Sequence, residues 1–163
     1  MNYSDSILSI MEIIGTVAFA SSGAMLAIRK RMDLFGICVL GVTTSVGGGM
    51  IRDLLLGITP PNIFRNPQNT VIALVVSIVV FLILYLRHGS MDGRLAAVYD
   101  RIMMVFDAVG LGVFTAMGIN TAREAGYDQT FLLVFVGVIT GVGGGLLRDV
   151  MAQEKPYILT KHI

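Results

Sequence analysis

Charge is what this sequence has least of. Only 14% of its 163 residues are charged, against about 25% in soluble domains, and 55% are hydrophobic. The mean hydropathy of +0.78 agrees with this balance. Twelve basic and eleven acidic residues nearly cancel, which excludes the strongly basic surface that a nucleic-acid partner requires. The composition predicts a polytopic membrane protein with no nucleic-acid partner.

Residues that usually carry catalysis or bind metals are also scarce. A single cysteine, Cys38, excludes an intrachain disulfide framework. The two histidines, His88 and His162, fall in predicted loops, and the sequence has no metal-binding H-E-x-x-H motif. It has no G-x-S-x-G nucleophile elbow, and GVGGGLLRD lacks the Lys-Ser/Thr ending of a phosphate-binding loop. We therefore predict no enzyme activity, no metal site and no cofactor.

Long apolar segments make up most of the chain, each close to the ~20 residues that a membrane-spanning helix needs. The N-terminus lacks the basic region of a cleaved signal peptide, so we expect the first segment to be retained. Two proline sequences, Pro60-Pro61 and Asn66-Pro67, predict a loop, and the polar stretch 87–101 predicts a linker. The expected fold class is an all-α polytopic membrane protein. Its five predicted membrane helices cover residues 7–28, 34–57, 70–86, 102–121 and 130–152.

The two halves of the chain are repeats of one another. Glu12 corresponds to Asp107 at an offset of 95 residues (107 − 12), and Gly47 to Gly143 at 96 (143 − 47) after one inserted residue. Each repeat holds an odd number of crossings, three, so the second copy is predicted to be inverted in the membrane. Residues 1–90 form the first repeat and residues 91–163 the second, whose third helix is missing. Neighbouring subunits could complete it, but we expect a truncated chain.

Each repeat carries a glycine triplet inside an apolar segment. Each glycine costs a helix ~1 kcal/mol relative to alanine, so the triplets are predicted to let the helix bend or unwind and to line a pore or cavity. The alternative is that they permit close helix packing. The triplets are Gly47, Gly48 and Gly49 in the first repeat and Gly143, Gly144 and Gly145 in the second.

An Arg-Asp pair follows each triplet: Arg52 with Asp53, and Arg148 with Asp149. Neighbours in sequence point to different sides of a helix, so we expect Arg52 to pair with Asp149 and Arg148 with Asp53 across the repeats. Such pairs would either form a structural latch or border a transport pathway, since charge within a membrane usually marks function.

A second pair of acids, Glu12 and Asp107, lies near the start of the first helix of each repeat. Two acids at opposite mouths of a pathway would attract cations. The alternative is that each is stabilised by the positive end of its helix dipole.

Basic residues favour one orientation in the membrane. Two loops and the C-terminal end hold eight lysines and arginines on one side, whereas Arg65 and Arg123 lie on the other. We therefore predict that the N-terminus is outside and the C-terminal end cytoplasmic. The eight are Arg29, Lys30, Arg31, Arg87, Arg94, Arg101, Lys155 and Lys161.

Three sequence elements resemble the bacterial branch of the trimeric intracellular cation channel family, also described as glycine transporters. They are FASSGAMLAIRKR, the GGG-x-x-RD string before a proline loop, and the second copy DAVGLGVFTAMG…GVGGGLLRD. The resemblance implies seven helices per subunit, a homotrimer in the lipid bilayer, and one pore per subunit lined by glycine kinks of the second and fifth helices. It also implies a passive plasma-membrane channel for K⁺ or Na⁺. The alternative is a carrier for a small zwitterion such as glycine. The sixth and seventh helices are absent here, and Arg148-Asp149 replaces the lysine motif with which animal members bind a phosphoinositide, so lipid regulation is not expected.

Overall fold

The computed structural model describes residues 3–86 and 93–156, with side chains from 6–84 and 98–156. Within these ranges the chain is helical and contains no strand, which confirms the predicted all-α fold class. The helices are α1 (Tyr3–Arg29), α2 (Leu34–Leu55), α3 (Asn62–Arg65), α4 (Gln68–Leu86), α5 (Gly93–Glu124) and α6 (Thr130–Met151).

Local sequence explains several helix boundaries. The Asp33 carboxylate caps α2 by accepting a hydrogen bond from the Gly36 backbone N–H at 2.7 Å. After α2 and α5 the chain turns through Gly57 and Gly126, whose φ angles of 71° and 88° lie in the left-handed region that favours glycine. The Pro60-Pro61 sequence then lies in the connection that leads to α3, as predicted.

The predicted linker over residues 87–101 is wrong in its second half, because α5 already begins at Gly93. Residues 87–92 lie outside the described part of the chain, as do His88 and Arg87. Contacts with α1 stabilise this longer helix. The Tyr99 hydroxyl donates to the Met25 carbonyl at 2.5 Å, and Asp100 pairs with Arg29 at 2.9 Å.

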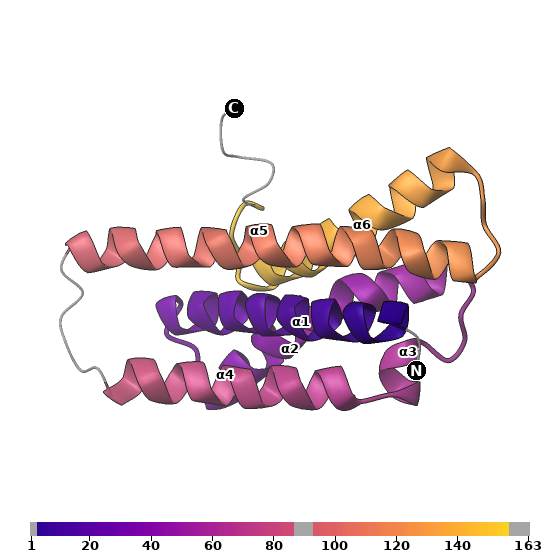
Figure 1. Ribbon diagram of the computed structural model, residues 1–163. Coiled ribbons are helices and arrows are strands. Elements are labelled where there is room, and N and C mark those ends of the chain that lie inside the picture. Colours follow the sequence, from indigo (N-terminus) through magenta and orange to yellow (C-terminus); the bar gives the residue numbers. More distant parts are fainter. Residues whose placement is uncertain (1–2, 87–92, 157–163) are drawn as a thin grey trace.

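The helices α1, α2, α5 and α6 pack against one another at the centre of the molecule. In Figure 1, α1 lies between α5 and α4, and α1 and α5 run in opposite directions. Behind them α2 packs against both α1 and α6, and α5 packs against α6. The helix α4 covers α1 and α2, where Ala73 and Ser77 are fully buried.

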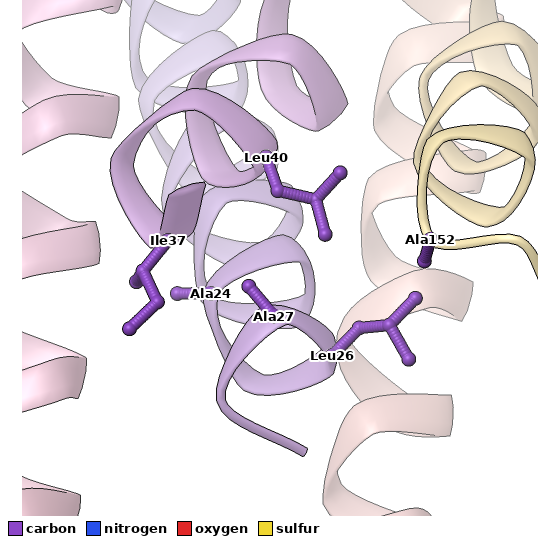
Figure 2. Packing of buried hydrophobic residues seen from close by; sticks show 6 residues of the cluster. All are labelled: Ala24, Leu26, Ala27, Ile37, Leu40 and Ala152. Carbon is purple, nitrogen blue, oxygen red and sulfur yellow. The ribbon is translucent and has the colours of Figure 1, made fainter. Parts of the chain in front are cut away.

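Small and branched side chains pack where the end of α1 meets the start of α2 and the end of α6. Figure 2 shows Leu40 and Leu26 directed toward Ala152 at the end of α6, with Ala24 and Ala27 on α1 beside Ile37. These residues are at most 4% exposed. The alanines allow close approach of the helices, and the last turn of α6 is thereby held against the first half of the chain.

Within the part of the chain that the structure describes, four helices are long and apolar enough to cross a membrane: Ser6–Arg29, Leu34–Leu55, Val98–Glu124 and Thr130–Met151. The fifth predicted crossing is α4, which has 19 residues. At 1.5 Å per residue it is about 28 Å long, close to the ~30 Å of a hydrocarbon core. Its crossing stays a prediction.

Candidate functional site

The helices α2 and α6 cross at their glycine triplets. A Cβ atom on Gly48 would collide with the Thr140 carbonyl oxygen, and one on Gly144 would collide with the Thr44 carbonyl oxygen. A Cβ on Gly143 would lie 3.1 Å from the Gly48 Cα. Backbone therefore meets backbone at this crossing, in the way that small residues permit in membrane proteins.

The third glycine of each triplet has a different environment from the first two. A Cβ on Gly47 would meet the Leu147 side chain at 2.6 Å, whereas the nearest atom to a Cβ on Gly49 would be the Arg52 guanidinium at 3.7 Å. A Cβ on Gly145 would meet no atom within 4 Å. The predicted unwinding is wrong for this structure, because α2 and α6 each run unbroken through their triplets. The pore-lining role of the glycines stays a prediction.

In the first repeat, Arg52 and Asp53 at the end of α2 bind each other. Arg52 Nε and Nη2 lie 2.9 and 2.8 Å from Asp53 Oδ1, and the two side chains are 10% and 2% exposed. The second Asp53 oxygen accepts the backbone N–H of Asn62, the first residue of α3, at 2.7 Å. Asp53 thus fixes both the arginine and the short helix that follows.

In the second repeat, Arg148 binds Asp149 in the same way, with Nε and Nη2 both 2.8 Å from Asp149 Oδ1. Arg148 Nη1 also binds Asp107 on α5 at 2.5 Å and donates to the Ser22 hydroxyl on α1. Ser22 in turn donates to Asp107 at 2.6 Å. This cluster joins α1, α5 and α6, and the Arg148 side chain is only 2% exposed.

The expected pairing across the repeats, Arg52 with Asp149 and Arg148 with Asp53, is wrong. Each arginine contacts the aspartate that follows it in sequence. The geometry of the crossing explains why. From Gly48 to Arg52, and from Gly144 to Arg148, the helices rise about 6 Å in opposite directions, so the two motifs lie on opposite sides of the crossing.

The two acids on the first helix of each repeat lie deep within their helices. Glu12 is nine residues past the start of α1 at Tyr3, and Asp107 is fourteen past the start of α5 at Gly93. Helix-dipole stabilisation fades within the first turn, so that explanation is wrong for both acids. Each instead faces the arginine of its own repeat: Asp107 by direct contact with Arg148, Glu12 by the electrostatic attraction of Arg52.

The first cavity, of about 310 Å³, opens beside Glu12 and the Arg52–Asp53 pair. Glu12 also accepts a hydrogen bond from Asn69 at the start of α4. Most of the remaining lining residues are polar, and one of them, Thr70, has a buried hydroxyl without a hydrogen-bond partner. The other polar lining residues are Thr16, Ser45, Asn62, Arg65, Asn66 and Thr121.

The second cavity, of about 260 Å³, lies beside Asp107 and the Arg148–Asp149 pair. Apart from these three residues its lining is apolar or glycine. Many of its lining residues correspond to those of the first cavity at the repeat offsets. The remaining lining residues are Phe19, Met104, Ala108, Leu111, Gly141, Val142, Gly145 and Leu146.

Among the side chains that hydrogen-bond to Glu12, Asp107 and Arg148, sequence reasoning missed Ser22 and Asn69. Ser22 could have been found from a difference between the repeats, because the residue that corresponds to it is the apolar Met117. At the offset of 95 residues, the counterpart of Asn69 would lie beyond residue 163, so the repeat comparison gave no signal there. In the part of the chain that the structure describes, no group of three or more His, Cys, Asp and Glu could hold a metal ion.

Comparisons with known proteins agree with this architecture. A family model described as "Glycine transporter" matches residues 9–85 and 104–163. The UPF0126 inner membrane protein YadS of Escherichia coli K12 is 44% identical over 155 residues, which cover 94% of this chain and 70% of that protein. A UPF0126 membrane protein of Deinococcus radiodurans is 41% identical over 91% of this chain, which spans 65% of that relative.

Solved structures of channels are similar in both sequence and fold. The trimeric intracellular cation channel orthologue from Rhodobacter sphaeroides is 34% identical with a TM-score of 0.84, and the match covers 97% of this chain and 76% of that one. A prokaryotic channel solved in 0.5 M KCl is 36% identical with a TM-score of 0.85, over 96% of this chain and 76% of that one. This chain therefore belongs to the bacterial branch of the trimeric intracellular cation channel family, which the glycine-transporter model also matches.

Proposed function

We propose that this chain is a subunit of a passive channel for monovalent cations, K⁺ or Na⁺, whose pathway passes through the first and second cavities. One observation carries the proposal: two cavities built on corresponding residues lie at opposite ends of the bundle, each with a carboxylate in its lining. In the first cavity the Glu12 carboxylate raises the local concentration of cations, whereas the Asp107 carboxylate of the second cavity is bound to Arg148.

The proposed architecture is two inverted repeats of three-helix units, residues 1–90 and 91–163, and the described part of the second repeat contains α5 and α6. The glycines of α2 and α6 lie midway along the pathway, and the buried Arg-Asp pairs act as latches that hold the ends of these helices. The channel is a homotrimer in the cell membrane, with the N-terminus outside and the C-terminal end cytoplasmic. The naming of the solved relatives as trimeric channels supports this assembly. Chemical cross-linking in native membranes, and protease access to tags on either end, test the assembly and orientation.

The test of the channel is reconstitution of the purified protein into a planar bilayer with KCl as the only solute. Discrete current steps that carry K⁺ or Na⁺ and exclude Cl⁻ are expected. A silent bilayer, with the protein shown to be folded and inserted, would contradict the proposal. This chain spans 76% of the channel from Rhodobacter sphaeroides and 76% of the channel solved in KCl. The same measurement is therefore also made on a protein extended to their length.

The second candidate is a carrier for a small zwitterion such as glycine. The first cavity favours it, because Glu12, Arg52 and Arg65 bring both signs of charge to one polar space. A carboxylate could receive an ammonium group while an arginine receives a carboxylate group. Uptake of radiolabelled glycine into proteoliposomes separates the candidates. Glycine uptake by a carrier saturates and discriminates against larger amino acids, whereas a channel conducts K⁺ and takes up no glycine.

A further inference from the structure

Two phenylalanines, Phe19 and Phe114, each line one of the two cavities. The Phe19 and Phe114 rings are stacked with their centroids 5.3 Å apart and an angle of 25° between planes. They are 3% and 8% exposed. Phe114 lines the first cavity and Phe19 lines the second, so the stacked rings lie between them. The two residues correspond to each other in the repeats, at the offset of 95 residues (114 − 19).

Glycines leave the space that the two rings occupy. A Cβ on Gly110 would collide with the Phe19 ring, and one on Gly15 would lie 3.1 Å from Phe114 Cε2. A Cβ on Gly144, at the helix crossing, would lie 3.3 Å from Phe19 Cδ2. Phe19 therefore also lies against the crossing of α2 and α6.

The chemistry of the pair suits a barrier. A hydrated cation needs oxygen ligands or water at every step of its path, and hydrophobic constrictions block conduction by excluding water. The face of an aromatic ring can attract a cation, but each of these rings has one of its two faces against the other ring.

We propose that the stacked rings of Phe19 and Phe114 are the partition between the two cavities, and that conduction requires the rings to separate. The inference rests on the proposed function insofar as the cavities belong to one pathway. The partition itself makes a statement about access that does not depend on conduction: a water-soluble reagent on one side of the membrane reaches one cavity and not the other.

The experiment uses thiols placed at corresponding positions. With Cys38 replaced by serine, Met50→Cys places a thiol in the first cavity and Leu146→Cys places one in the second. A charged, membrane-impermeant methanethiosulfonate is applied to right-side-out and to inverted membrane vesicles. In the parent protein we expect each thiol to react from one side only, and the two thiols to react from opposite sides.

Replacing both rings is expected to remove this sidedness. In the Phe19→Ala/Phe114→Ala background each thiol reacts from both sides, with the slow side accelerated at least tenfold. If the alanine pair does not fold, Phe19→Leu/Phe114→Leu keeps most of the volume but loses the stacked faces, and a smaller acceleration is expected. The matched control is Phe131→Ala/Phe135→Ala, a stacked pair 6.3 Å apart on the exposed face of α6, which should leave sidedness unchanged.

The outcomes separate the partition from the channel. Sidedness that persists without the two rings, or reaction from both sides in the parent, overturns the partition whether or not the protein conducts. A thiol that reacts from neither side also overturns it, because the residue then faces no open cavity. K⁺ flux is measured on the same vesicles: an unchanged labelling pattern with normal flux removes the partition and keeps the channel. Altered labelling with no flux in either protein keeps the partition and removes the channel.

Discussion

The first and second cavities are built on the same repeat, yet they differ in chemistry. Around the shared Arg-Asp pair, the first cavity has Thr16 and Ser45 where the second has Leu111 and Gly141. The first is also bordered by α3 and the start of α4, which add four amide or guanidinium side chains. The corresponding residues therefore form a cavity in both halves of the chain, while the lining side chains differ in polarity. These four side chains are Asn62, Arg65, Asn66 and Asn69.

The acid of each cavity is also held differently. Asp107 is in direct contact with Arg148 and with Ser22, so its charge is satisfied within the protein. Glu12 instead accepts from Asn69 and interacts with Arg52 electrostatically across the cavity. The Glu12 carboxylate therefore lines the first cavity beside Asn69, whereas the Asp107 carboxylate holds three helices, α1, α5 and α6, together.

The largest expected effect tests what the two cavities share, the glycine crossing. Gly48→Leu and Gly144→Leu each force a side chain into a carbonyl oxygen of the facing helix, and backbone cannot move aside as a side chain can. We expect no folded protein in size-exclusion chromatography from either variant. The control is Gly145→Ala, where a Cβ meets no atom within 4 Å and the helix gains up to about 1 kcal/mol. Folded Gly48→Leu protein would show that the crossing is looser than described.

The next effect tests the difference between the two arginines. Arg148→Met leaves Asp107 and Asp149 without their buried cation, and removing one member of a buried pair costs about 3–5 kcal/mol. Arg52→Met removes the ion-pair partner of a single carboxylate, Asp53, which keeps its hydrogen bond from the Asn62 backbone, and it removes only a longer-range attraction from Glu12. Thermal unfolding in detergent should therefore show a larger loss of Tm for Arg148→Met. Equal losses would mean that the second cluster is no more structural than the first.

A smaller effect tests which acid faces the ions. Glu12→Gln should lower K⁺ conductance about fivefold, the factor that ~1 kcal/mol of attraction corresponds to. The loss should disappear near 1 M KCl, where the screening length is about 3 Å. Asp107→Asn should instead lower Tm, because its charge is bound to Arg148. A conductance loss from Asp107→Asn that salt reverses, at unchanged Tm, would contradict the proposed division of roles.

The smallest effect concerns the ion pairs at the end of α6. Glu154 lies 3.0 Å from both Arg29 and Lys30. Partial burial raises the pKa of Glu154, but the hydrogen bonds and charges of Lys30 and Arg29 outweigh it, so the pKa lies below its ordinary value of 4.5. The stabilisation is therefore complete above about pH 4.5 and is lost as the pH falls through the lower pKa of the folded state. Glu154→Gln should reduce the unfolding free energy by less than about 1 kcal/mol at pH 7, and the difference from the parent should vanish in acid.

Most of the helices could be predicted because a membrane-spanning helix requires a long apolar stretch of local sequence. Apolar stretches of about 20 residues located α1, α2, α4 and α6 to within a few residues. The start of α5 was missed, because three charged residues, Arg94, Asp100 and Arg101, interrupt the apolar residues that follow Gly93. Contacts of Tyr99 and Asp100 with α1 stabilise this part of the helix, and such contacts are not visible in local composition.

The sequence by itself determined that this is a helical membrane protein with a duplicated motif, and which residues of the two copies correspond. Hydropathy and repeat offsets depend on residue identity alone, so they need no coordinates. Only the tertiary structure decided which charges pair, that the glycines close the crossing, and that two phenylalanines meet between the cavities. The physical reason is that side-chain partners depend on helix direction and separation. Two antiparallel helices in contact at Gly48 and Gly144 place their Arg-Asp motifs on opposite sides, so the arginines bind their own neighbours.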